Sequence, residues 1–88
     1  MAENINGNGI EIEKQIFEFI KEKFNIGDDP DYTPEINLFD YGFVDSLGAT
    51  VIITFAEENW NIEISQRDLT LYPMNSVNEI SAVVRSKL

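Results

Sequence analysis

Residues 42–47 read Gly42-Phe43-Val44-Asp45-Ser46-Leu47, and they join a long acidic loop to a segment whose apolar spacing predicts a helix. Ser46 therefore stands at the mouth of that helix. The first N–H groups of a helix point out of its N-terminus, and the helix dipole favours negative charge there. This position suits a serine whose hydroxyl becomes a phosphate ester. The alternative is a plain N-cap, in which the hydroxyl only accepts a backbone N–H.

Upstream of the serine, apolar residues recur at helical spacing. Ile12, Ile16, Ile20 and Phe24 follow one another every four residues, and charged side chains occupy the opposite face. This pattern predicts an amphipathic helix over residues 10–24.

The segment that follows the serine predicts a second helix, from Ser46 to about Glu58. Its apolar stripe should face the core and consists of Leu47, Val51, Ile52, Phe55 and Ala56. Ile53 lies outside this stripe, so we expect it to be exposed and to contact a partner protein.

The chain between these helices, residues 28–44, contains two prolines and a glycine without a sustained period. It predicts a long loop. Its larger apolar side chains should pack against the helices; they are Leu38, Phe39 and Phe43.

The C-terminal third predicts two further helices. Residues 60–64 alternate apolar and polar side chains, which indicates a short extended connector. Ser65 should cap one or two helical turns. Ser76 and Glu79 then form the S-x-x-E pattern of a capping box, before a last helix that continues to Leu88.

Together these elements predict an all-α fold. We expect a small antiparallel four-helix bundle, with three main helices, one short helix and a long loop between the first two. A chain of 88 residues forms one domain. That domain should cover residues 10–88, after an Asn- and Gly-rich, flexible N-terminal segment at residues 1–9.

The composition excludes several functions. The sequence has no cysteine, so it has no disulfide or thiolate metal site, and it has no histidine to act as a general base toward Ser46. We therefore do not expect an enzyme. A net charge of -10 disfavours binding to nucleic acid or to an anionic membrane.

The acidic residues are unevenly distributed, because no lysine or arginine occurs between Lys23 and Arg67. Such a face would either attract basic partners or simply keep the protein in solution. No apolar run approaches the roughly 18 residues that span a membrane, and the N-terminus has no secretory-signal pattern. We expect a cytoplasmic monomer.

The stretch Leu38-Phe39-Asp40-Tyr41-Gly42-Phe43-Val44-Asp45-Ser46-Leu47 resembles the prosthetic-group attachment motif of acyl carrier proteins. Downstream, residues 57–64 are similar to the end of the second helix and the acidic-apolar segment of that family. The resemblance extends over residues 10–88, which would form the carrier domain.

The resemblance implies a covalent 4′-phosphopantetheine on Ser46, placed there from coenzyme A by a phosphopantetheinyl transferase with Mg²⁺. The terminal thiol of that arm would carry an acyl or aminoacyl group as a thioester. Leu47 would also contribute to the cofactor site. Asp45 would either orient the coenzyme or bind the transferase, as its matching position does in the family, or act only as a second cap of the helix. Further partners would be a loading enzyme and downstream acyl-processing enzymes with basic patches. The expected partner contacts are Asp40, Phe43, Gly48, Ile53, Glu57 and Glu58.

The chain departs from parts of the family pattern. Fatty-acid carriers usually have acidic residues two and five positions after the serine, where this chain has Gly48 and Val51. Asp-Ser-Leu-Gly is closer to D-alanine carriers and to free-standing carriers of specialised pathways. Peptidyl carriers usually have Gly-Gly-His-Ser, which this chain lacks. The cargo and the pathway stay open: fatty acid, polyketide or aminoacyl transfer.

Two other classes compete with the carrier hypothesis. Acidic and polar residues alternate from Asp29 to Asp40 like the ligands of a calcium loop, but Pro34 replaces the required glycine. This favours weak cation binding over a dedicated metal site. The second alternative is an acidic helical interaction domain without a prosthetic group, in which Ser46 would be dispensable.

Overall fold

The computed structural model describes residues 9–88, and within that range the chain forms helices and loops without a β-strand. The helices are α1 (Gly9–Lys23), α2 (Ser46–Trp60), α3 (Gln66–Leu71) and α4 (Val77–Lys87). The predicted all-α fold is therefore confirmed. Apart from Gly9, the segment predicted to be flexible lies outside the described residues. None of these four helices is long and apolar enough to cross a bilayer.

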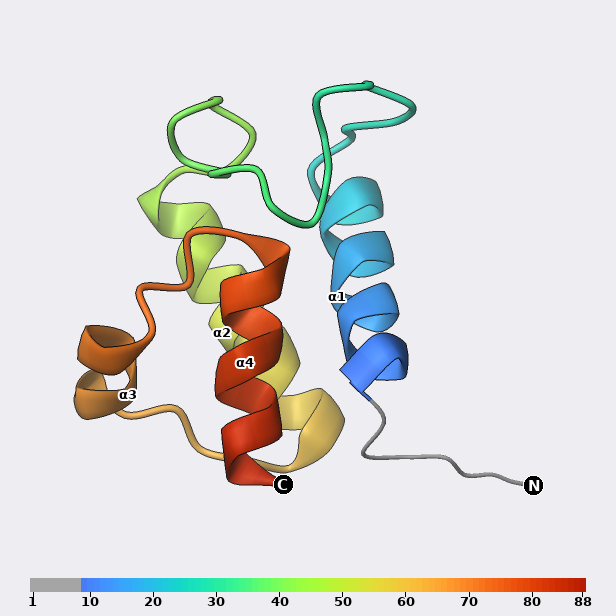
Figure 1. Ribbon diagram of the computed structural model, residues 1–88. Helices are drawn as coiled ribbons and strands as arrows, with labels where there is room; N and C mark the ends of the chain where they lie inside the picture. Colours follow the sequence, from blue (N-terminus) through green and yellow to red (C-terminus); the bar gives the residue numbers. More distant parts are fainter. Residues whose placement is uncertain (1–8) are drawn as a thin grey trace.

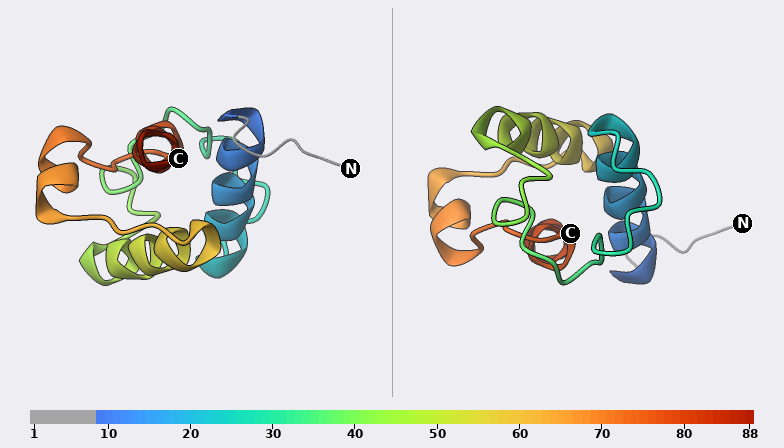
Figure 2. Two further views of the ribbon diagram at one scale, coloured as in Figure 1. Left: turned by 90° about the horizontal axis from the view of Figure 1, so that it is seen from below. Right: turned by 90° about the horizontal axis from the view of Figure 1, so that it is seen from above.

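The three long helices surround a common core. In Figure 1, α1 runs upward whereas α2 and α4 both run downward, so α1 is antiparallel to the other two. Figure 2 shows α4 end-on, with α1 and α2 inclined to it, and α3 on the side away from α1. α1 packs against α4. The stacked rings of Phe19 and Phe55, with centroids 3.8 Å apart, join α1 to α2.

The core is formed by branched aliphatic side chains. Its most deeply buried members are Ile12, Ile16, Ile20, Leu38, Val77, Ile80, Val83 and Val84. The isoleucine stripe predicted for the first helix is therefore confirmed. Leu38, the buried residue from the long loop, is also placed as the sequence predicts.

The buried face of α2 differs from the prediction by one residue. Leu47 is 79 % exposed, whereas Gly48, Ile52 and Ala56 are buried at spacings of four. Gly48 lies so close to Phe24 that a Cβ atom at this position would be 2.7 Å from the ring. Because a glycine occupies the buried position, the preceding leucine is turned by about 100° around the helix, toward solvent.

The two C-terminal helices begin with serine caps. Ser65 and Asp68 form a complete capping box at α3, where each side chain accepts the backbone N–H of the other residue. At α4, Ser76 Oγ accepts the Glu79 N–H at 3.2 Å, which is the serine half of the predicted box. The reciprocal pair is thus found at the short helix.

The long loop is hydrogen-bonded to α1 and to the segment that precedes α4. The Tyr32 hydroxyl donates to the Phe17 carbonyl of α1 at 2.7 Å, and burial raises the pKa of this hydroxyl. Closer to α4, Leu38 N–H donates to the Asn75 carbonyl at 2.7 Å. These contacts hold the loop across the top of the bundle in Figure 1, where it leads into the N-terminus of α2.

Candidate functional site

Asp45, and not Ser46, is the N-cap of α2. Its backbone is extended (φ -108°, ψ -175°), and its Oδ1 accepts the Gly48 N–H at 2.8 Å. Its carbonyl accepts the Ala49 N–H at 2.9 Å. Ser46 is the first residue of the helix and is exposed. The N-cap alternative for Ser46 is therefore wrong, because the neighbouring carboxylate already has that role.

The loop that precedes Ser46 closes on itself. Its ends are joined at the Leu38 carbonyl, which accepts the N–H groups of Phe43 at 3.0 Å and Val44 at 3.2 Å. Gly42 has φ +75°, a conformation that suits glycine. Val44 is buried and therefore anchors the chain two residues before the serine. The serine hydroxyl is thus presented from a fixed backbone, at the start of a 15-residue helix.

The N-terminus of α2 has the electrostatics of an anion site. The first turn of a helix leaves backbone N–H groups without intrahelical acceptors. The Asp45 carboxylate accepts a hydrogen bond from the Gly48 N–H. Within the described residues, the N–H groups of Ser46 and Leu47 have no hydrogen-bond acceptor. The first turn of α2 contains no acidic side chain. A phosphate ester on Ser46 would therefore lie where the helix dipole favours negative charge.

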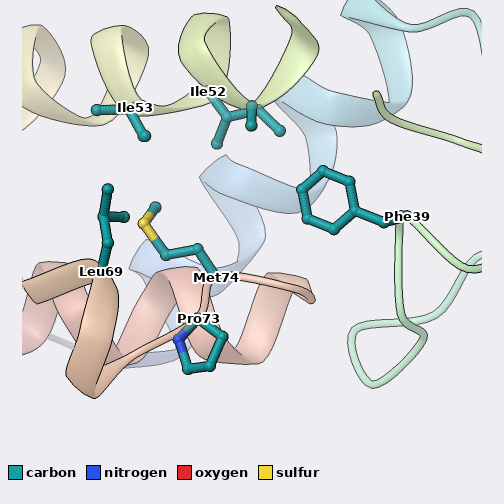
Figure 3. Close-up of a pocket in the computed structure, with 7 residues that line it drawn as sticks. Phe39, Ile52, Ile53, Leu69, Pro73 and Met74 are labelled. Carbon is teal, nitrogen blue, oxygen red and sulfur yellow. The ribbon is translucent and has the colours of Figure 1, made fainter. Parts of the chain in front are cut away.

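An apolar pocket of about 190 Å³ lies beside α2, one helical turn from Ser46. Figure 3 shows Ile52 and Ile53 of α2 on one side, Leu69 and Met74 on the other, and Phe39 of the long loop at one end. The lining residues are Phe39, Ala49, Ile52, Ile53, Leu69, Pro73 and Met74. This volume is smaller than the roughly 300 Å³ or more of pockets that bind drug-sized ligands. The pocket can therefore hold only an apolar chain of a few carbons.

The six residues expected to contact a partner differ in their exposure and in their distance from Ser46. Asp40 is exposed in the loop near the serine, and Phe43 is half-buried and forms a T-shaped ring contact with Tyr32. Gly48 is buried, so Phe24 makes the close approach there and a partner protein cannot contact it. Ile53 is half-buried and lines the pocket, which corrects its predicted exposure.

The two remaining expected contacts lie at the other end of α2. Glu57 and Glu58 are 11 and 12 residues after Ser46, which corresponds to about 17 Å along the helix axis. Glu58 is exposed. The Glu57 carboxylate accepts the Ile64 N–H at 2.8 Å and so fixes the connector to α3. These two residues therefore lie at the end of α2 that is far from Ser46, and they do not make the surroundings of the serine acidic.

Acidic and polar side chains of the long loop accept hydrogen bonds from the backbone. Within residues 9–88, no three His, Cys, Asp or Glu side chains are placed to hold one metal ion. Instead, Asp29 Oδ1 accepts the Asp31 N–H at 2.9 Å, and Asn37 Oδ1 accepts the N–H of Phe39 and that of Asp40, both at 3.0 Å. These side chains stabilise turns.

Sequence reasoning missed the far wall of the pocket. Leu69, Pro73 and Met74 are brought to α2 by the α3–α4 segment. Met74 is 6 % exposed and has φ +61°, an uncommon conformation for a residue other than glycine. No local periodicity marks these residues. The signal in the sequence is the apolar run Leu-Tyr-Pro-Met, which begins at the last residue of the short helix.

Comparison with known proteins agrees with this geometry. Residues 14–84 match the family model described as "Phosphopantetheine attachment site". No curated protein and no solved structure matches the chain. The match covers α2 from end to end, including the exposed serine at its first position, and extends over most of the 88 residues. The chain therefore belongs to the phosphopantetheine attachment-site family, whose members are carriers of the acyl-carrier-protein type with a covalently bound 4′-phosphopantetheine.

Proposed function

We propose that this protein is a discrete, non-catalytic carrier whose 4′-phosphopantetheine is attached to Ser46. The observation that carries the proposal is the division of roles at the start of α2. Asp45 caps the helix, and Ser46 at the next position is exposed. The hydroxyl can thus be esterified without the loss of a hydrogen bond that stabilises the helix.

The chain's own residues fit this group. The phosphodiester would lie at the N-terminus of α2, beside the N–H groups of Ser46 and Leu47, and the exposed serine leaves space for a flexible arm. The arm supplies the thiol that this cysteine-free chain lacks. A tethered thioester also raises the effective concentration of cargo at each enzyme that binds the carrier.

Attachment requires a separate enzyme, because the sequence contains no histidine that could act as a general base toward Ser46. The Ser46 oxygen would attack the pyrophosphate phosphorus of coenzyme A that bears the pantetheine. The bond from this phosphorus to the bridging oxygen would break, and adenosine 3′,5′-bisphosphate would leave. The serine proton would pass to a base of the phosphopantetheinyl transferase, and Mg²⁺ would neutralise the pyrophosphate.

We favour an acyl cargo of a fatty-acid, polyketide or related specialised pathway over an aminoacyl cargo. The pocket beside α2 supports this choice, because its lining is made of apolar side chains. A charged amino group would have to be desolvated there without a partner. The carrier would act as a cytoplasmic monomer with a loading enzyme and acyl-processing enzymes. Its net charge of -10 opposes self-association.

The test is the intact mass of the protein after incubation with coenzyme A, Mg²⁺ and a broad-specificity phosphopantetheinyl transferase. We expect the wild type to gain one phosphopantetheine and S46A to gain none. Thr50→Ala is the matched control, because it removes another exposed hydroxyl one turn further along α2. A wild type that gains no mass with several transferases would instead favour the interaction domain without a prosthetic group.

A further inference from the structure

A groove runs along the line where α1 meets α2. Its volume between the two helices is about 350 Å³. A second hollow of about 380 Å³, toward Gly27, adjoins it and shares Glu18 and Glu22 with it. We call the first hollow the α1–α2 groove. It is bounded by Gln15, Glu18, Phe19 and Glu22 of α1 and by Phe55 and Asn59 of α2.

The two walls of the α1–α2 groove are joined before any ligand binds. The rings of Phe19 and Phe55 stack across the line between the helices, with centroids 3.8 Å apart. Further along, Asn59 Nδ2 donates to Gln15 Oε1 at 3.0 Å. A groove that is already formed loses little conformational entropy when it is occupied, which favours binding.

The α1 wall of the groove has a row of carboxylates. Glu18 and Glu22 are 7 and 11 residues after Glu11, which places all three within about 40° of one another around the helix. All three are exposed. The ion pairs within residues 9–88 are Lys21–Asp28 and Lys87–Asp68, so neither Glu18 nor Glu22 is paired with a cation there.

This combination of an apolar floor and a carboxylate wall fits one type of side chain. Half-buried Phe19 and Phe55 provide apolar contact, and Glu18 and Glu22 provide negative charge beside it. Arginine has an apolar stem and a cationic tip, so its stem can pack on the rings while its guanidinium pairs with a carboxylate. Its planar fork also matches a carboxylate with two hydrogen bonds, which the lysine ammonium does not.

The α1–α2 groove is remote from both Ser46 and the apolar pocket. Phe55 is nine residues after Ser46, which corresponds to about 14 Å along the axis of α2 and about half a turn around it. Ile53, which lines the apolar pocket, is turned by about 200° from Phe55. Figure 2 shows α1 and α3 on opposite sides of the molecule. A ligand in the groove therefore leaves the serine and the pocket uncovered.

We propose that the α1–α2 groove binds an arginine-bearing segment of a partner protein and holds the carrier there while Ser46 stays accessible. Glu18 and Glu22 are separated by about 6 Å along the helix axis. Alternate residues of an extended segment are about 6.6 Å apart. Two arginines with one residue between them can thus reach both carboxylates. The inference goes beyond the proposed attachment, because binding in the groove does not depend on the serine.

The probe for this inference is a fluorescently labelled peptide of about seven residues in which arginine and alanine alternate, long enough to follow the groove. Its fluorescence anisotropy is measured against the full chain at about 0.15 M NaCl, where charges more than about 8 Å apart are largely screened. We expect the wild type and S46A to bind equally. The same peptide with citrulline in place of arginine should not bind, because citrulline is uncharged.

Removal of the carboxylates should weaken binding only when they line the groove. We expect Glu18→Gln combined with Glu22→Gln to raise Kd about fivefold, as the loss of two exposed ion pairs implies. Glu35→Gln combined with Glu63→Gln is the matched control, because it changes the net charge equally at exposed residues outside the groove. An equal rise of Kd in both double variants would overturn the inference, since binding would then follow net charge alone.

Lysine substitutions test the same groove in the opposite direction. Lys14 lines the groove, so Lys14→Gln should lower Kd for the arginine peptide, whereas Lys23→Gln, at an exposed α1 position outside the groove, should not. A wild type that does not bind the peptide would also overturn the inference. Circular dichroism checks that each variant keeps its helices. Attachment at Ser46 is tested separately by the gain of phosphopantetheine, so either proposal can fail without the other.

Discussion

At the scale of single residues, Gly48 decides which face of α2 is buried. A Cβ atom at this position would lie 2.7 Å from Phe24 Cε1 and 2.9 Å from Val44 Cγ1. Both distances are shorter than van der Waals contact allows. The glycine therefore lets Phe24, which directly follows α1, and Val44 of the long loop approach the first turn of α2. Leu47 is left on the outside, beside Ser46.

We expect Gly48→Ala to destabilise the protein although alanine is the better helix former. The gain in helix propensity is about 1 kcal/mol, whereas overpacking a closed site costs about 1–3 kcal/mol. The measurement is the free energy of unfolding in urea. In a Phe24→Ala background the same substitution should cost less, because only the close contact with Val44 remains. Stabilisation by Gly48→Ala in the wild-type background would refute the close approach.

The roles of Asp45 and Ser46 could be only partly predicted from the sequence. Asp, Ser and Leu in succession indicated a helix start, and the surrounding motif is the basis for the proposal that Ser46 is modified. Both Asp45 and Ser46 are good cap residues, so their order was ambiguous until the backbone of Asp45 was seen to be extended. The burial of Gly48 was not predictable either, because a residue without a side chain contributes nothing to an apolar pattern.

At the scale of elements, α3 is joined to α4 by an ion pair at its N-terminal turn. It contains no fully buried residue, and Lys87 Nζ of α4 lies 2.6 Å from Asp68 Oδ2 at its N-terminal turn. The hydrogen bond from Lys87, together with the backbone N–H of Ser65, lowers the pKa of Asp68 from 3.8 to about 2. This contact fixes the helix that supplies Leu69 to the pocket.

The lowered pKa predicts how the contribution of this contact depends on pH. Because the folded protein binds the Asp68 proton more weakly than the unfolded chain does, the contribution is present above pH 3.8 and is lost as the pH falls toward 2. We expect the wild type to have a higher Tm than Asp68→Asn at about pH 6, and the difference to shrink in acid. The check is thermal unfolding of both proteins across this range. A difference that stays constant with pH would contradict the role of the Asp68 charge.

Periodicity predicted the long helices well, because their buried positions repeat within one segment. The isoleucines of α1 and the valines of α4 are examples. The pocket could not be predicted in the same way. Its walls come from the long loop, α2 and the α3–α4 segment, and only tertiary packing brings these together. The role of Glu57 was missed for the same reason, since its acceptor position depends on how the connector folds back.

At the scale of the whole molecule, charge is the main source of repulsion. The chain has sixteen acidic and six basic residues, so most carboxylates have no cation to pair with. This repulsion opposes the compact state. The exposed acidic residues lie largely on α1, in residues 28–45 and at the end of α2, whereas residues 46–56 of α2 include no charged side chain.

We therefore expect NaCl to stabilise the fold. Between about 0.1 M and about 1 M salt the Debye length falls from about 10 Å to about 3 Å. The repulsion between carboxylates is then screened, and Tm should rise. Thermal unfolding by circular dichroism measures this, with an uncharged osmolyte at equal osmolality as the control. A Tm that falls with NaCl would show that favourable ion pairs outweigh the repulsion.

The separation of the cap from the serine has a consequence for the life of the protein in the cell. If the serine held the helix together, a newly made chain would have to refold around each modification. Here Asp45 completes the helix on its own, so under the proposed attachment at Ser46 we expect the chain to have the same fold before and after modification. Synthesis, modification and removal of the arm would then be independent events.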